Sequence, residues 1–225
     1  MRLSDVSSWR NNNFIQFIKP PDPTFNSNRK RLNKLIGETL SKDGKVLDLG
    51  SGGRKLHDRI INFDLSQFNH VDIVGNAHFL PFNNNSFDFI IATAVLEHVM
   101  YPQVVVDEIY RCLAINGMVY AETPFLQGFH SDPHDYQRYT LTGLKVLFEK
   151  FEERDSGVCV GPVSVLTWYI RKFPTIFFKN KLVNKMIEFI TGWLFFVFKY
   201  LDILFSKASN AHSLASGLYF LSYKK

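Results

Sequence analysis

Val46-Leu47-Asp48-Leu49-Gly50-Ser51-Gly52-Gly53 is the stretch that decides the fold. Its apolar start, interrupted by one acid, is typical of a buried β-strand, and three glycines in four positions end that strand in a tight turn. Such a turn lets backbone N–H groups approach a ligand closely. In open α/β sheets, ligands bind at the carboxyl ends of the strands. The stretch therefore predicts a nucleotide-like ligand at the end of the first strand.

Strand-like and helix-like runs alternate along most of the chain. Short apolar runs typical of strands occupy residues 45–49, 60–64, 71–74, 87–92, 118–122, 154–159 and 214–223. Apolar residues at helical spacing occupy residues 28–40, 101–113 and 140–151. This alternation predicts an α/β fold, a doubly wound and Rossmann-like sheet of about seven strands.

The alternation fails in two places, which gives the predicted domain organisation. Residues 1–27 mix Asn, Pro and scattered aromatics and are expected to form an irregular N-terminal arm. Residues 28–162 and 207–225 form the sheet domain. Residues 163–206 are rich in Phe and other apolar side chains, so we expect an apolar helical insertion before the last strand, a candidate for membrane contact.

The net charge of +5 is distributed unevenly. Residues 1–45 carry nine basic and four acidic side chains, residues 46–170 carry eight and fifteen, and residues 171–225 carry nine and two. Because the glycine turn lies in the acidic part, no nucleic-acid partner is expected. The basic, Phe-rich end instead favours an anionic membrane surface as a partner.

Two further features indicate the compartment. Cys112 and Cys159 lie in a predicted helix and a predicted strand and are interpreted as buried thiols, which fits a reducing environment. Residues 1–19 contain no apolar run of the kind that a secretory signal needs. We therefore expect a cytoplasmic protein, peripheral at the inner face of the cell membrane if the insertion contacts lipid.

The residues after the glycine turn argue against a dinucleotide. A dinucleotide site needs Gly-x-Gly-x-x-Gly at the start of a helix whose N-terminus binds the pyrophosphate. Here Lys55 stands where the third glycine belongs, and only seven residues separate Gly52 from Ile60. No long helix fits in that interval, so NAD is disfavoured.

Five stretches, in order and at compatible spacing, resemble the motifs of class I S-adenosylmethionine-dependent methyltransferases of the small-molecule and lipid type. They are residues 46–53, 63–65, 74–82, 86–92 followed by 96–99, and 111–117. The resemblance covers roughly residues 45–125. It implies S-adenosyl-L-methionine as cofactor and a methyltransferase form of the Rossmann-like sheet. The shortened first connection and the late apolar insertion also resemble methyltransferase-like proteins encoded with surface-polysaccharide genes.

The resemblance also implies which residues contact the cofactor. They are Asp48, Gly50, Ser51, Gly52, Asp64, Leu65, Asn76, Ala77 and His98. The Asp64 carboxylate is suited to accept hydrogen bonds from two ribose hydroxyls, the alternative being a helix cap. Asp48 is expected to orient the glycine loop. Asn76, where the family has Asp, either accepts from the adenine amino group or is a turn residue, and His98 either contacts cofactor or substrate or caps the next helix.

The densest polar cluster, residues 130–139, follows the fifth predicted strand. Methyl transfer from a sulfonium needs a positioned acceptor and, for a hydroxyl, a base. We predict His134 as the first candidate base, His130 as the second, and Arg138 as a clamp on substrate or loop. The alternative is that these side chains only fasten a lid. Metal ligation by His130, His134 and Asp135 is a further alternative, but the spacing matches no strong motif, and no metal is predicted.

The most apolar part of the insertion is residues 189–205. It contains Lys199 and Asp202 within seventeen residues, whereas a spanning helix needs about 20 residues with few charges. We predict an interfacial helix whose apolar side enters the lipid, with residues 163–178 as its partner. The alternatives are a lid helix packed on the domain and a dimer interface.

Together these patterns predict an S-adenosylmethionine-dependent methyltransferase that acts at a membrane face on a lipid-linked glycan or a similar amphiphile. The first alternative is a soluble small-molecule substrate. The second is a non-catalytic binding protein of a cell-envelope complex, which Arg54 and Asn76 motivate because both depart from the family pattern. Thr93-Ala94-Val95 stands where a nucleic-acid methyltransferase would carry an Asn/Asp-Pro-Pro-Tyr/Phe run, so that class is disfavoured.

Overall fold

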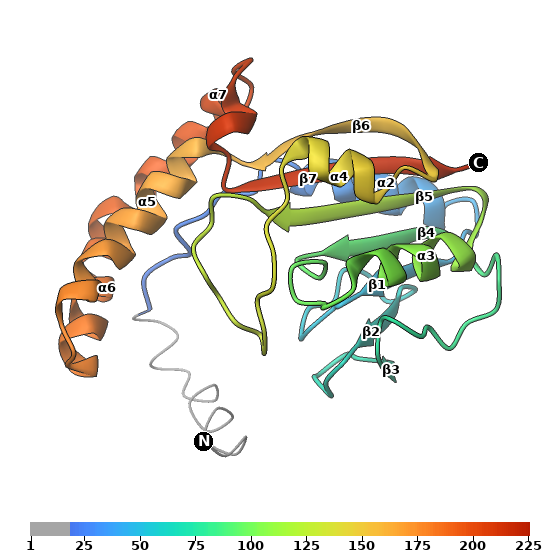
Figure 1. Cartoon of the computed structure of the whole chain (residues 1–225), viewed down its shortest axis with the longest axis horizontal. Helices are drawn as coiled ribbons and strands as arrows, with labels where there is room; N and C mark the ends of the chain where they lie inside the picture. The colour runs from blue at the N-terminus through green and yellow to red at the C-terminus, as the bar shows by residue number, and fades with distance from the viewer. Residues whose placement is uncertain (1–18) are drawn as a thin grey trace.

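The computed structural model describes residues 19–225 and contains one seven-stranded sheet (Figure 1). The strand order is β3-β2-β1-β4-β5-β7-β6. The strands are β1 (Val46–Leu49), β2 (Ile61–Asp64), β3 (Ile73–Val74), β4 (Phe87–Thr93), β5 (Leu113–Pro124), β6 (Phe151–Val160) and β7 (Gly217–Lys224). The predicted doubly wound sheet of seven strands is confirmed. The predictions that concern residues 1–18, the arm and the missing leader, fall outside the described residues.

Strands β1 to β5 are parallel to their neighbours, whereas β7 is antiparallel between β5 and β6. The carboxyl ends of the parallel strands therefore meet at one edge of the sheet, where Gly50, Leu65, Ala94 and Phe125 are the first residues beyond β1, β2, β4 and β5. In Figure 1 this edge faces the helices of the insertion.

Helices cover both faces of the sheet and create two cores. They are α2 (Arg29–Leu40) on one face, and α3 (Pro102–Cys112) and α4 (Leu141–Leu147) on the other. Because successive residues of a strand point to opposite faces, β4 serves both cores. Phe89 and Ile91 pack in the cluster with α2, and Ile90 and Ala92 pack in the cluster with α3 and α4.

Several predicted boundaries are wrong. Strand β5 begins at Leu113 rather than at 118, so the turn expected at Asn116 lies inside the strand as an irregularity with φ of 62°. Strand β6 begins three residues earlier than predicted, because it pairs with the full length of β7. Strand β7 begins only at Gly217, since a 3₁₀ turn, η4 (Ala211–Leu214), occupies its expected start.

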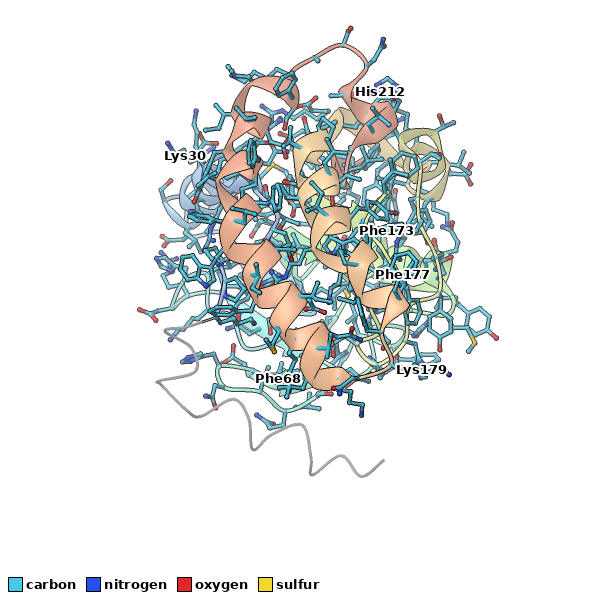
Figure 2. All side chains as sticks on the ribbon, turned by 90° about the vertical axis from the view of Figure 1, so that its left-hand side faces the viewer. Lys30, Phe68, Phe173, Phe177, Lys179 and His212 are labelled. Atoms are coloured by element: carbon cyan, nitrogen blue, oxygen red, sulfur yellow. The ribbon has the colours of Figure 1, made fainter. Side chains whose placement is uncertain are left out.

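The insertion is a pair of antiparallel helices with short 3₁₀ extensions. Its elements are α5 (Pro162–Lys172), η2 (Phe173–Phe177), α6 (Lys181–Phe195), η3 (Phe196–Leu201) and α7 (Asp202–Phe205). Figure 2 shows α5 and α6 lying side by side. The prediction of one continuous helix over 189–205 is wrong, since α6 gives way to η3 at Phe196, whereas its contact with lipid remains a prediction. Within residues 19–225, no helix combines the length and apolar character that crossing a membrane requires.

The described part of the arm, residues 19–27, joins the insertion to the sheet. Asn26 forms a β-bridge with Val160, and the backbone N–H of Phe25 donates to Ser164 Oγ at 3.0 Å. Thr167 Oγ1 in α5 donates to the Pro23 carbonyl at 2.7 Å. The arm therefore fixes the position of α5 relative to the end of β6.

Candidate active site

The glycine turn after β1 is bonded to the end of β2. The N–H groups of Gly50 and Ser51 donate to the Phe63 carbonyl at 2.8 and 3.1 Å, and that of Gly52 donates to Asp64 Oδ2 at 2.8 Å. Gly50 and Gly52 have φ of 68° and 55°, a left-handed backbone that glycine adopts without strain. The turn therefore places its backbone directly beside the Asp64 carboxylate.

The glycines of this turn have different surroundings. A Cβ at Gly50 would meet Val95 Cγ2 at 2.4 Å, so Gly50 is needed for packing. A Cβ at Gly52 or Gly53 would meet nothing within 4 Å. The bare backbone of Gly52 and Gly53 therefore borders open space, which fits a ligand that lies against main chain.

The Asp64 carboxylate retains capacity to bind a ligand. Its Oδ1 accepts from the Ser66 N–H at 2.9 Å, and Oδ2 accepts from Gly52. Because a carboxylate offers about four lone-pair sites, two remain for the hydroxyls of a ribose. Residues 65–72 form turns and no helix, so the helix-cap alternative for Asp64 does not apply. The neighbouring Leu65 is 60% exposed and borders the same edge.

Asn76 and Ala77 follow β3, next to the end of β2. Asn76 Oδ1 accepts from the His78 N–H at 3.0 Å and lies 2.7 Å from His78 Nδ1, so this side chain closes a turn. Ala77 is half-buried. The cofactor contacts assigned to both residues remain predictions.

Asp48 is fully buried and pairs with Arg54, a residue to which the sequence assigned no contact. Arg54 Nε donates to Oδ2 at 2.8 Å and Nη2 to Oδ1 at 2.5 Å. Burial raises the pKa of Asp48, and the bidentate guanidinium opposes that rise. Asp48 thus holds the loop through Arg54, whose Nη1 has no hydrogen-bond partner within residues 19–225 and is a candidate cationic donor beside the glycine turn.

The loops after β4 and β5 are bonded to each other at the same edge of the sheet. His98 Nδ1 donates to the His134 carbonyl at 2.5 Å, and the Tyr136 N–H donates to the Glu97 carbonyl at 2.8 Å. Gln137 Nε2 donates to the Leu96 carbonyl at 3.3 Å. The predicted polar cluster is therefore a loop lying on the exit of the central strand.

Arg138 fastens this loop, and His134 is exposed on it. Arg138 donates to both oxygens of Asp135 and to the carbonyls of Gln127 and Gly128. The Arg138 guanidinium lowers the pKa of Asp135 to about 2, against the effect of burial. These contacts are those of the lid-fastening alternative. The His134 imidazole lies 5.4 Å from the Tyr136 ring, and its role as base remains a prediction.

Glu97 is the residue at this edge that sequence reasoning missed. It is fully buried, and neither carboxylate oxygen has a hydrogen-bond partner among the described residues. Burial raises its pKa to about 7, although His98 and Arg138 favour its charged form. His98 Nε2 lies 3.7 Å from Glu97 Oε1, and the His98 ring meets His130 edge to face at 5.1 Å. An acid four residues beyond the end of an apolar central strand was the available signal.

Comparison with known proteins agrees with this geometry. Residues 47–121 match a family model described as a methyltransferase domain. A putative sarcosine dimethylglycine methyltransferase from Galdieria sulphuraria is 13% identical, with a TM-score of 0.55 over 94% of this chain and 97% of that one. A methyltransferase from Thermotoga maritima, described as a possible histamine N-methyltransferase, is 15% identical, with a TM-score of 0.52 over 84% and 87%.

The fold itself is not confined to methyl transfer. The [4+2]-cyclase SpnF is 16% identical, with a TM-score of 0.53 over 86% of this chain and 80% of that one. At these identities the structural likeness concerns the fold alone. No curated protein sequence is significantly similar to the chain.

The glycine turn, Asp64 and the matched domain define a Rossmann-like methyltransferase corner. Residues 47–121 are thus a methyltransferase domain within a Rossmann-like fold, and this domain and fold imply S-adenosylmethionine as the cofactor.

Proposed function

We propose that this enzyme methylates an amphiphilic acceptor at a membrane face, such as a lipid-linked glycan. The observation that carries the proposal is the apolar, basic surface of the insertion, residues 163–206, beside the carboxyl edge of the sheet. Twenty of the thirty-one exposed large hydrophobic side chains described lie between residues 166 and 205. A surface patch of this size marks an interaction site.

The insertion buries two charged side chains and exposes the apolar side chains around them. Lys199 and Asp202, the charges within its most apolar stretch, are buried. Lys199 Nζ donates to the Asp22 carbonyl at 2.5 Å, and Asp202 accepts from the N–H groups of Val163 and Ser164 at 2.9 and 2.8 Å. Both charges are thus used inside the fold, while the apolar side chains around them face outward. This arrangement favours an apolar environment on the outer side.

The charge of the insertion favours lipid over a second protein. It carries six lysines and arginines and two acidic residues. Lys179, Lys181 and Lys185 are exposed around the turn that joins η2 to α6, close in sequence to the exposed Phe177. In Figure 2 Phe173, Phe177 and Lys179 follow one another from the middle of the helix pair to its lower end. Lysines are depleted from protein–protein interfaces, whereas a basic rim on an apolar face suits anionic headgroups.

The insertion also touches the candidate active site. A Cβ at Gly128, in the loop after β5, would lie 2.0 Å from the ring of Trp168 in α5. Backbone of that loop therefore packs directly on the insertion. An acceptor held in the headgroup layer by the insertion would be presented to the edge that carries His134.

The residues present assign roles for the reaction. S-adenosylmethionine, when bound, supplies an electrophilic methyl group. The Asp64 carboxylate and the glycine backbone are suited to its ribose and amino acid parts, and Arg54 Nη1 to its carboxylate. His134 is exposed at the acceptor side, where it takes the proton of an acceptor hydroxyl.

The test combines membrane binding and methyl transfer. Purified protein is floated with vesicles of anionic or zwitterionic lipid, and radiolabelled methyl transfer from S-adenosylmethionine is then measured with a membrane lipid extract. We expect flotation with anionic vesicles and label in the organic phase. Replacing Phe173 and Phe177 by Ser reduces both, whereas Ile115→Ser, an exposed apolar side chain at the opposite end of β5, changes neither.

Two results would contradict the proposal. Label that appears only in water-soluble products shows a soluble acceptor. Undetectable binding of S-adenosylmethionine by calorimetry shows a non-catalytic protein. Mass spectrometry of surface lipids and glycans with and without the gene identifies the product. The species that becomes one methylene unit lighter when the gene is absent is the methylated product.

A further inference from the structure

We propose that Glu97, His98 and His130 form a binding site for a divalent transition-metal ion, for which Zn²⁺ fits the ligand set best. Glu97 and His98 follow β4, and His130 follows β5, so both loops of the acceptor edge contribute. One ligand atom from each residue lies within 4.8 Å of the other two. Two imidazoles and one carboxylate form a ligand set used by catalytic zinc sites, which keep a further position open.

The buried Glu97 carboxylate is suited to bind a cation. Its side chain is fully buried and both oxygens lack a hydrogen-bond partner within residues 19–225. An unpartnered buried carboxylate is costly, and buried charges in proteins are paired or coordinate metals. A cation between Glu97 and the two imidazoles would give the Glu97 carboxylate a partner.

The histidines are oriented as metal ligands usually are. His98 Nδ1 contacts the His134 carbonyl, which can only accept, so Nδ1 carries a proton and Nε2 is the ring nitrogen that faces Glu97. His130 Nδ1 lies 3.3 Å from the Gly128 carbonyl and 3.8 Å from an Asp135 oxygen. These two acceptors can take a proton from Nδ1, which leaves Nε2 of His130 free to bind a metal. A metal-bound imidazole typically donates its other N–H to a carbonyl or a carboxylate.

The nearest positive charge is already compensated. Arg138 Nη2 lies 3.4 Å from His130 Nδ1, but Arg138 forms a bidentate pair with Asp135. Asp135 also accepts from the His130 N–H at 2.8 Å and so holds that backbone in place. The carboxylate of Glu97 has no such partner, and a divalent cation would stabilise its ionised form.

The spacing suits an ion with a small adjustment. Two ligands at about 2.1 Å from a tetrahedral ion are about 3.4 Å apart, and Glu97 Oε1 is 3.7 Å from His98 Nε2. A cation here would lower the pKa of an acceptor hydroxyl bound at its open position, with His134 left to take the proton. That role rests on the proposed function, whereas metal binding itself does not.

The experiment measures metal binding by untagged protein that has been treated with a chelator and dialysed. Zn²⁺ is titrated by calorimetry, and Co²⁺ is added separately because its visible absorption reports a tetrahedral nitrogen and oxygen site. We expect one ion per chain at micromolar or tighter affinity. Glu97→Gln and His130→Gln each weaken binding at least about tenfold, and His212→Gln, an exposed histidine in η4, leaves it unchanged.

The outcomes separate this proposal from the proposed function. Zinc binding that is absent, or equal in wild type and His130→Gln, overturns the metal site. His130 lies on a half-buried loop, so this variant decides the question even where Glu97→Gln fails to fold. S-adenosylmethionine affinity is measured in parallel: its loss with zinc binding intact contradicts the methyltransferase proposal alone.

Discussion

At the scale of single residues, two features of Gly50 require glycine at that position. Its φ is 68°, and a Cβ would lie 2.4 Å from Val95 Cγ2. We expect Gly50→Ala to lower the free energy of unfolding by about 2 kcal/mol or more, through backbone strain and overpacking. Gly53→Ala, which meets open space without positive φ, is the matched control and should stay within about 0.5 kcal/mol. Urea unfolding followed by circular dichroism measures both, and equal stabilities would contradict the packing role.

The second prediction at this scale concerns Asp64. We expect Asp64→Asn to weaken S-adenosylmethionine binding at least about tenfold, because hydrogen bonds to an ionised acceptor are about twice as strong as neutral ones. Calorimetric titration measures the affinity, and an unchanged melting temperature shows that the turn is intact. Asp58→Asn, a fully exposed acid near the turn, is the control. Unchanged affinity in Asp64→Asn would remove this residue from the site.

Some site residues were predictable and others were not. The glycines and Asp64 belong to local patterns, in which a strand ends in a turn, so the sequence indicates them directly. Arg54 and Glu97 have partners and neighbours that no local sequence pattern specifies. Arg54 reaches back to Asp48 through the turn, and Glu97 is enclosed by a loop about forty residues further along.

At the scale of elements, the connection from β1 to β2 contains no helix, and the side chain of Arg54 packs beside the glycine turn instead. Parallel neighbours usually need a crossover of a dozen or more residues with a helix. Here residues 50–60 make the crossover without one, and the partly exposed Arg54 pairs with Asp48 beside the turn. The short interval between the two strands predicted that no helix would form there, but it did not predict the pairing of Arg54 with Asp48.

Helix α5 depends on a distant cap. Its first N–H groups donate to Asp202, and a Cβ at Gly161 would lie 2.4 Å from Asp202 Oδ1. We expect Asp202→Ala to destabilise the insertion by about 1–2 kcal/mol, as loss of a cap does. The fluorescence of Trp168 and Trp193, both in the insertion, reports its unfolding in urea.

The control for this element is Glu188→Gln. Glu188 pairs with Lys172 at 2.9 Å across the helix pair, and both side chains are partly exposed. Such a pair contributes about 0–1 kcal/mol, so the control should change stability less than Asp202→Ala. Equal effects would show that the cap is not the interaction that holds α5.

At the scale of the whole molecule, charge and apolar surface lie at one end. We expect the triple variant Lys179→Glu, Lys181→Glu and Lys185→Glu to reduce binding to anionic vesicles by at least about tenfold, since each Lys near such a surface contributes about 1 kcal/mol. Wild-type binding should also weaken as salt rises, because the Debye length falls. Co-sedimentation at several salt concentrations measures both effects.

Lys42→Glu is the matched control for this prediction. Lys42 is exposed just after α2, before the amino end of β1 and therefore on the side of the sheet away from the insertion. Its replacement should leave vesicle binding unchanged. If it weakens binding as much as the triple variant, the attraction reflects net charge and not the insertion.

The sequence by itself determined the order of the strands, the glycine turn and the acid at Asp64, because these depend on local periodicity and short-range turn chemistry. The resemblance of five ordered motifs to a known family then implied the cofactor class. Only the tertiary structure decided the rest. It folded Lys199 and Asp202 inward and left the apolar side chains of the insertion outside. It also enclosed Glu97 with His98 and His130. Both outcomes depend on which loops meet across the sheet edge, and chain order alone does not specify those contacts.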